Sequence, residues 1–180
     1  MSTRALYTFT DGDCSYNVYK HHDGYVSGAA RTLKMGLDWF AWQLPRFEAD
    51  EFAAAFIAAG KFGSWLETKK DLDEWFEERG PKAKNRPWTG GGVRLMPQGN
   101  PTKIACKNCG DIAYRYEIKM ATSLPHHIQS IANKIPVEPQ LWITAFSGNW
   151  WEKAEEEQIF NGPFDEFYAW ALAKDKEQAA

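Results

Sequence analysis

The stretch from Tyr16 to Ala30 constrains the fold most, because the spacing of its side-chain types changes within it. Residues 16–20 alternate between two faces with the period of a β-strand, and from Ser27 onward apolar residues recur every three or four positions, as in an amphipathic helix. Asp23-Gly24 lies between the two patterns and is typical of a turn. The sequence therefore predicts a strand that closes at this turn and a helix with Ser27 as its N-cap.

A second alternating run precedes this strand. Residues 4–10 place Ala5, Tyr7 and Phe9 on one face, and Asp11-Gly12-Asp13 follows as a turn signal. Two alternating runs about a glycine turn predict an N-terminal β-hairpin.

The later elements are predicted from periodicity and from the residues that break it. Helices are expected at 27–44, 47–59 (with Gly60 as its stop), from Ser64 or Asp71 to Arg79, at 124–133, and after Asn161-Gly162-Pro163. Strands are expected at 93–96, 111–120, 141–146 and, as an edge, 151–160. On strand 111–120, apolar residues occupy one face and mostly charged residues the other.

This order predicts an α+β fold. We expect a single antiparallel β-sheet with an N-terminal hairpin, packed on one face by about four α-helices. Residues 1–180 are expected to form one domain, interrupted by an irregular, basic, Gly/Pro-rich loop at about 80–110.

Composition narrows the class of protein. Aromatic residues make up 15% of the chain, with nine Trp, which is enough to build a core and leave some rings for an interface. We see no apolar run of the length that a membrane span or a signal peptide needs, and three cysteines do not form a disulfide framework. We therefore expect a cytoplasmic protein that does not act at a membrane.

Charge is segregated along the chain. Residues 79–107 carry seven Lys plus Arg and no Asp or Glu, whereas the rest of the chain has 14 basic and 24 acidic residues. The candidate binding residues of this basic loop are Lys82, Lys84, Arg86, Trp88, Arg94, Lys103 and Lys107. Cations beside one aromatic ring suit contact with a nucleic-acid backbone and a stacked base, and they equally suit an acidic protein surface. Solvated charge without a partner is the third interpretation.

His21, His22, Asp23 and Tyr25 form a second candidate, at the corner between the strand and the helix. Histidine exchanges protons near neutral pH, and a carboxylate can orient it for catalysis. Adjacent strand residues point to opposite faces, however, so we expect His21 and His22 to lie apart. The simpler interpretation is a turn in which Asp23 caps the helix.

Cys106 and Cys109 have the spacing of a zinc knuckle. Zinc needs two further ligands, which would come from Cys14 or from the histidine pairs at 21–22 and 126–127. The sequence has no second pair of cysteines with this spacing. The alternative to a zinc site is therefore that Cys106 and Cys109 are two reduced thiols in a turn and bind no cofactor.

Three segments resemble a group of uncharacterised proteins encoded by bacteriophages and prophages. They are Arg4-Ala-Leu-Tyr-Thr-Phe9, Tyr16-Asn-Val-Tyr-Lys-His-His-Asp-Gly-Tyr25 with Gly28-Ala-Ala30, and Gly110-Asp-Ile-Ala-Tyr-Arg-Tyr-Glu-Ile118. The resemblance implies an accessory protein of phage origin in the host cytoplasm. It implies no activity, cofactor or catalytic residue.

The leading functional hypothesis is therefore a non-enzymatic phage or prophage protein that binds a host or phage protein, such as a defence or regulatory factor. The alternative is nucleic-acid binding through residues 82–107, with zinc at Cys106 and Cys109. A small hydrolase or nuclease that uses His21, His22 and Asp23 is the third hypothesis. The sequence leaves the oligomeric state open.

Overall fold

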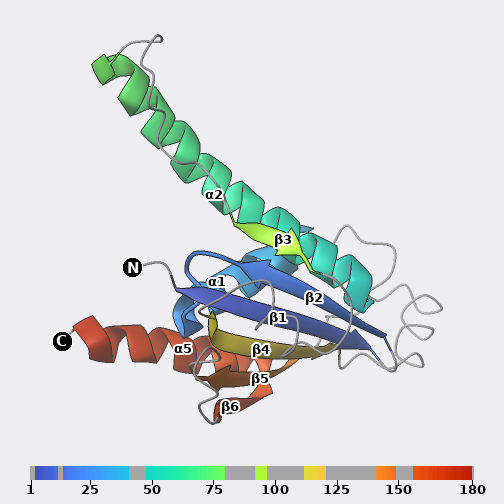
Figure 1. Cartoon of the computed structure of the whole chain (residues 1–180). Coiled ribbons are helices and arrows are strands. Elements are labelled where there is room, and N and C mark those ends of the chain that lie inside the picture. The colour runs from blue at the N-terminus through green and yellow to red at the C-terminus, as the bar shows by residue number, and fades with distance from the viewer. Residues whose placement is uncertain are drawn as a thin grey trace.

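A six-stranded sheet forms the centre of the computed structural model, which describes residues 3–11, 14–40, 48–79, 92–96, 112–120, 141–148 and 156–179 (Figure 1). The strands are β1 Arg4–Asp11, β2 Cys14–Lys20, β3 Val93–Leu95, β4 Ile112–Met120, β5 Leu141–Ser147 and β6 Glu157–Pro163. The helical elements are α1 Val26–Met35, the π-helical turn η1 Gly36–Phe40, α2 Ala49–Arg79 and α5 Phe164–Ala179. These elements confirm the α+β class.

The sheet is mixed, so the prediction of an antiparallel sheet is wrong. The strand order is β3-β2-β1-β4-β5-β6, and β1 pairs with β4 in parallel, whereas the other neighbours are antiparallel. The predicted hairpin β1–β2 is confirmed, and β3 pairs with its outer strand. The helices α1 and α2 come between β2 and β3, and β4 then pairs on the other side of β1. The long connection from β1 to β4 permits this parallel pair.

The described residues contain three α-helices instead of about four, because α2 runs without a break through Gly60. A Cβ atom at position 60 would lie 2.7 Å from Cγ2 of Val93. Glycine is therefore needed for the close approach of α2 to β3, and it does not end the helix. The helix predicted at 124–133 lies outside the described residues.

The start of the first helix differs from the prediction. The N-cap of α1 is Tyr25, without a side-chain cap, and the hydroxyl of Ser27 instead donates to Asp175 Oδ1 of α5 at 2.5 Å. Asn161-Gly162-Pro163 completes the edge strand β6, in which Asn161 pairs with Thr144 of β5, and α5 begins directly after it at Phe164, as predicted. The predicted edge position of this strand is confirmed.

The core lies between one face of the sheet and the helices. Alternate residues of β1 meet the first half of α2: the rings of Tyr7 and Phe56 have centroids 4.4 Å apart, and those of Phe9 and Phe52 lie 5.5 Å apart. Next to β1, on the same face of the sheet, Tyr116 of β4 packs edge-on against Phe167 of α5. The helices cover this face because these alternating apolar residues point toward it.

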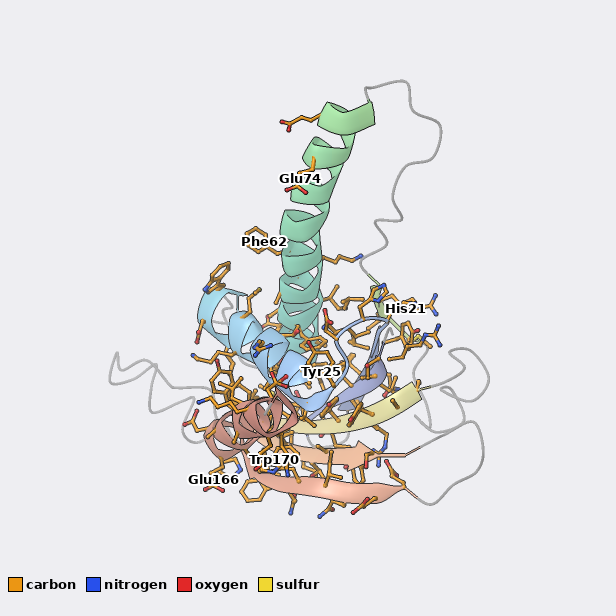
Figure 2. The ribbon with its side chains drawn as sticks, turned by 90° about the vertical axis from the view of Figure 1, so that its left-hand side faces the viewer. His21, Tyr25, Phe62, Glu74, Glu166 and Trp170 are labelled. Carbon is orange, nitrogen blue, oxygen red and sulfur yellow. The ribbon has the colours of Figure 1, made fainter. Side chains whose placement is uncertain are left out.

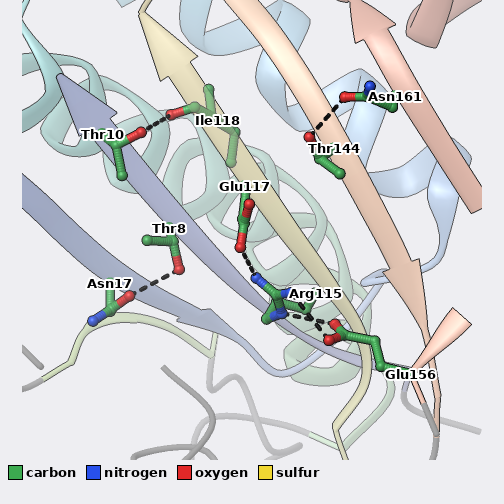
Figure 3. A network of polar contacts seen from close by, with 9 residues as sticks. All are labelled: Thr8, Thr10, Asn17, Arg115, Glu117, Ile118, Thr144, Glu156 and Asn161. Atoms are coloured by element: carbon green, nitrogen blue, oxygen red, sulfur yellow. Dashed lines mark hydrogen bonds and ion pairs between the residues drawn. The ribbon is translucent and has the colours of Figure 1, made fainter. Parts of the chain in front are cut away.

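The opposite face of the sheet carries a row of polar residues (Figure 3). In strand order the row is Asn17, Thr8, Glu117, Thr144 and Asn161. Thr8 Oγ1 donates to Asn17 Oδ1 at 2.9 Å, and Thr144 Oγ1 donates to Asn161 Oδ1 at 3.0 Å. These bonds satisfy groups that are buried, such as the fully buried Asn17.

Arg115 lies beside this row and is 8% exposed, although the sequence placed it on a charged outer face. Its guanidinium donates to both carboxylate oxygens of Glu156, at 2.8 and 3.1 Å, and also to Glu117. It stacks 3.9 Å from the ring centroid of Phe146. Burial disfavours the charge of Arg115, but its hydrogen bonds to Glu156 and Glu117 outweigh that effect and raise the pKa of Arg115.

Candidate functional site

The strand–helix corner at residues 21–25 is held in place from two strands. The amide of Gly24 donates to the carbonyl of Thr3 at 2.9 Å, and its own carbonyl accepts from the Tyr116 hydroxyl at 2.8 Å. A Cβ atom on Gly24 would lie 2.7 Å from Cβ of Ala5. The corner thus fits against the start of β1 only because residue 24 is glycine.

Asp23 takes a left-handed conformation at this turn, with φ of 52°. Its carbonyl accepts a 3.1 Å bond from Lys20 Nζ and packs against Gly28, where a Cβ atom would come within 2.4 Å. The side chain of Asp23 is exposed. Asp23 therefore shapes the turn through its backbone, and the side-chain cap expected for the helix is not made.

The ring of His21 is bonded to side chains of the two neighbouring strands. Its Nδ1 accepts a 3.3 Å bond from Arg4 Nε and lies 2.7 Å from the Tyr19 hydroxyl. Because arginine can only donate, Nδ1 is an acceptor, the Tyr19 hydroxyl donates to it, and a neutral ring carries its proton on Nε2. Burial, followed by the charges of Arg4, His22 and Arg94, lowers the pKa of His21.

His22 lies against His21, contrary to the expectation that the two rings point to opposite faces. Their centroids are 4.6 Å apart with the planes nearly perpendicular. The strand β2 ends at Lys20, so the alternation that separates neighbouring side chains no longer applies at 21 and 22.

Arg94 connects the corner with the basic loop. It lies on β3 opposite Tyr19, and its guanidinium carbon stands 4.9 Å from the centroid of the Tyr19 ring. One residue before β3, the carbonyl of Gly92 accepts a 3.1 Å bond from the His21 amide. A Cβ atom on Gly92 would lie 2.2 Å from that of His21, so only glycine permits this contact. The strand–helix corner and the basic loop, which the sequence predicted as separate candidate sites, thus lie next to each other at His21 and Arg94.

The remaining candidate residues lie away from His21 or outside the described residues. Figure 2 shows Tyr25 at the start of α1, apart from His21. The other basic-loop residues, together with the two predicted zinc-binding cysteines, lie outside the described residues: Lys82, Lys84, Arg86, Trp88, Lys103, Lys107, Cys106 and Cys109. Cys14 is an exposed free cysteine at the start of β2.

The hydrogen bonds of His21 determine what the corner can do. In a histidine–carboxylate pair the Nδ1–H group donates to the carboxylate, but here Nδ1 accepts from Arg4 and Tyr19. Within the part of the chain that the structure describes, no group of three or more His, Cys, Asp or Glu residues could hold a metal ion. The arrangement instead collects positive charge beside an aromatic ring, which suits an anionic group.

Two residues of the site, Arg4 and Tyr19, were not among the sequence candidates. Their strands were predicted, and Tyr19 is one position before the end of β2. The pairing of β3 with β2 was the missing information, because it places Arg94 opposite Tyr19.

Among the described helices, none combines the length and the apolar character needed to cross a membrane. No protein-family model, curated protein or solved structure matches this chain.

Proposed function

We propose that this chain is a non-enzymatic phage or prophage accessory protein that binds a host or phage protein through an acidic surface of that partner. The binding surface would be the cationic corner, defined as Arg4, His21, His22 and Arg94, continued by the basic loop. The phage origin rests on the sequence resemblance alone.

One observation carries the proposal: Arg94 of the basic loop lies beside Tyr19, whose hydroxyl bonds to the same His21 nitrogen as Arg4. Arg94 is exposed, and Arg4 and His22 are half-buried. Exposed cations near an acidic partner accelerate and orient association. The lowered pKa of His21 favours the neutral ring at pH 7, so the arginines supply the charge.

Nucleic-acid binding is the second candidate, because an arginine over a tyrosine ring also suits a phosphate beside a stacked base. Such binding weakens steeply as salt increases. Retention of single- or double-stranded DNA at about 50 mM salt, lost at about 200 mM, would favour this candidate.

The test is affinity capture with the full chain from a nuclease-treated lysate of the natural host. We expect the unmodified chain to retain a protein that Arg4→Glu/Arg94→Glu does not retain. The matched control is Lys174→Glu/Lys176→Glu, which makes the same charge change in the last turns of α5, where Lys174 is 46% exposed. Capture that survives the corner variant would contradict the proposal, as would capture that requires nucleic acid.

A further inference from the structure

The helix α2 is longer than the surface on which it packs. Among the side chains of α2 that the structure describes, the buried ones, such as Phe52, Phe56 and Ala59, precede Lys61, whereas Glu74 and Glu77 are exposed. Figures 1 and 2 show the rest of the helix projecting beyond the sheet and the other helices. We call residues 63–79 the arm; at 1.5 Å per residue it extends about 25 Å.

The composition of the arm does not suit a helix that stands alone in water. It contains five large apolar residues, Trp65, Leu66, Leu72, Trp75 and Phe76. Helical spacing places positions 65, 72 and 76 along the same side of the helix as position 62. A helix of about 17 residues is only marginally stable in isolation, so the arm needs a surface to pack against.

The foot of the arm also has exposed apolar surface. Trp39 of η1 is 53% exposed, and its ring packs edge-on to Phe62 with centroids 5.6 Å apart. The foot of the arm thus carries an apolar pair on the side of the helix to which the spacing assigns positions 65, 72 and 76.

Charge along the helix indicates what covers this surface. Residues 61–70 contain three Lys and one Glu, a net charge of +2, whereas residues 71–79 contain five acidic residues and one Arg, a net charge of −4. Two such helices side by side in parallel would bring like charges together. In an antiparallel pair, each basic half would lie beside an acidic half. The two helix dipoles would then point in opposite directions, which is also favourable.

We propose that two copies of this chain pair through their arms, antiparallel about a two-fold axis. The tip of each arm would reach the foot of the other, where Trp39 and Phe62 lie. Such an interface is the same on both copies and closes, so it gives a dimer and not a filament. The inference does not depend on the cationic corner or its partner.

The test is the mass of the full chain by sedimentation equilibrium over a concentration series, with charge reversals in the arm. Lys69→Glu/Lys70→Glu makes both halves of the arm acidic, and Asp73→Lys/Glu74→Lys/Glu77→Lys makes both basic. We expect a dimer for the unmodified chain and, for each reversal, dimerisation weakened by at least about tenfold.

The combined five-residue variant restores opposite charges in the antiparallel arrangement, and we expect its dimerisation to return to within about threefold of the unmodified chain. Lys174→Glu/Lys176→Glu on α5 is the control and should remain dimeric. A monomer at every concentration would overturn the inference and assign the arm to a different partner. A combined variant no more dimeric than the single reversals, with unchanged helix content by circular dichroism, would equally overturn it.

Discussion

The rings of Tyr7 and Tyr116 are stacked 4.9 Å apart in the core, yet their hydroxyl groups have different surroundings. Tyr116 donates to the carbonyl of Gly24 at 2.8 Å, whereas the buried hydroxyl of Tyr7 has no hydrogen-bond partner within the described part of the chain. Burial raises the pKa of both phenols, so both stay protonated. The two tyrosines therefore allow a hydrogen-bonded hydroxyl to be compared with a buried hydroxyl that has no partner among the described residues.

We expect Tyr116→Phe to lower the free energy of unfolding by about 1–2 kcal/mol, because the carbonyl of Gly24 loses its donor. Tyr7→Phe removes a hydroxyl whose burial is uncompensated, so it should be neutral or stabilise by up to about 1 kcal/mol. Urea unfolding of both variants measures the difference. Equal losses would show that the Tyr7 hydroxyl has a partner.

Gly60 tests the contact between α2 and β3. Glycine to alanine inside a helix usually stabilises by about 0.5–1 kcal/mol, but here the new Cβ would meet Val93 at 2.7 Å. We expect Gly60→Ala to destabilise by about 1–3 kcal/mol through overpacking.

The same substitution in a Val93→Ala background should be neutral or stabilising, because the space is then free. Thermal unfolding of the two single variants and the double variant gives the coupling between the two positions. Additive effects would mean that α2 does not approach β3 so closely.

The Arg115 ion pair tests the polar face. Glu156→Gln keeps the shape but removes the charge that compensates a nearly buried guanidinium, and we expect a loss of about 1–3 kcal/mol. Asp38→Asn breaks the exposed pair with Lys34, whose two side chains are 45% and 44% exposed, and should cost about 0.5 kcal/mol or less. Chemical denaturation compares them, and similar losses would show that the burial of Arg115 is unimportant.

His21 should make stability depend on pH. Its folded pKa lies below the ordinary value of 6.5, so its contribution is fully present above 6.5 and is lost as pH decreases through that value, when the unfolded state takes up the proton first. His21→Asn keeps an acceptor near the Nδ1 position but cannot be protonated.

We therefore expect the free energy of unfolding to decrease less between about pH 7.5 and 5.5 in His21→Asn than in the unmodified chain. Urea unfolding at the two pH values measures both decreases. Carboxylates titrate in both proteins, so the difference isolates His21; parallel curves would argue against its burial beside Arg4 and Arg94.

Local patterns predicted most of the strands, because alternation in β1, β2 and β4 reflects one buried face. They could not predict the parallel pairing of β1 with β4, which depends on the path of the chain through more than a hundred residues. Gly60 was misread for a related reason: a glycine that ends a helix and one that admits Val93 look the same in sequence.

The candidate site, like the fold, could be predicted only in part from the sequence. His21 and Arg94 were both chosen from local chemistry, as a histidine at a turn and a cation in a basic loop. Their proximity depends on the β2–β3 pairing, for which three residues of strand give little sequence signal. Arg4 was missed because its role depends on the position of His21 Nδ1, 17 residues away in sequence.

The central claim is that cations at the corner hold an acidic protein. Its most direct test is the affinity of the captured partner for the full chain and for Arg4→Glu/Arg94→Glu, measured at about 50 and 200 mM salt. We expect the unmodified chain to bind more tightly at the lower salt and the variant to lose at least about tenfold in affinity, with a weaker salt dependence. Equal affinities and equal salt dependence for the two proteins would contradict the claim.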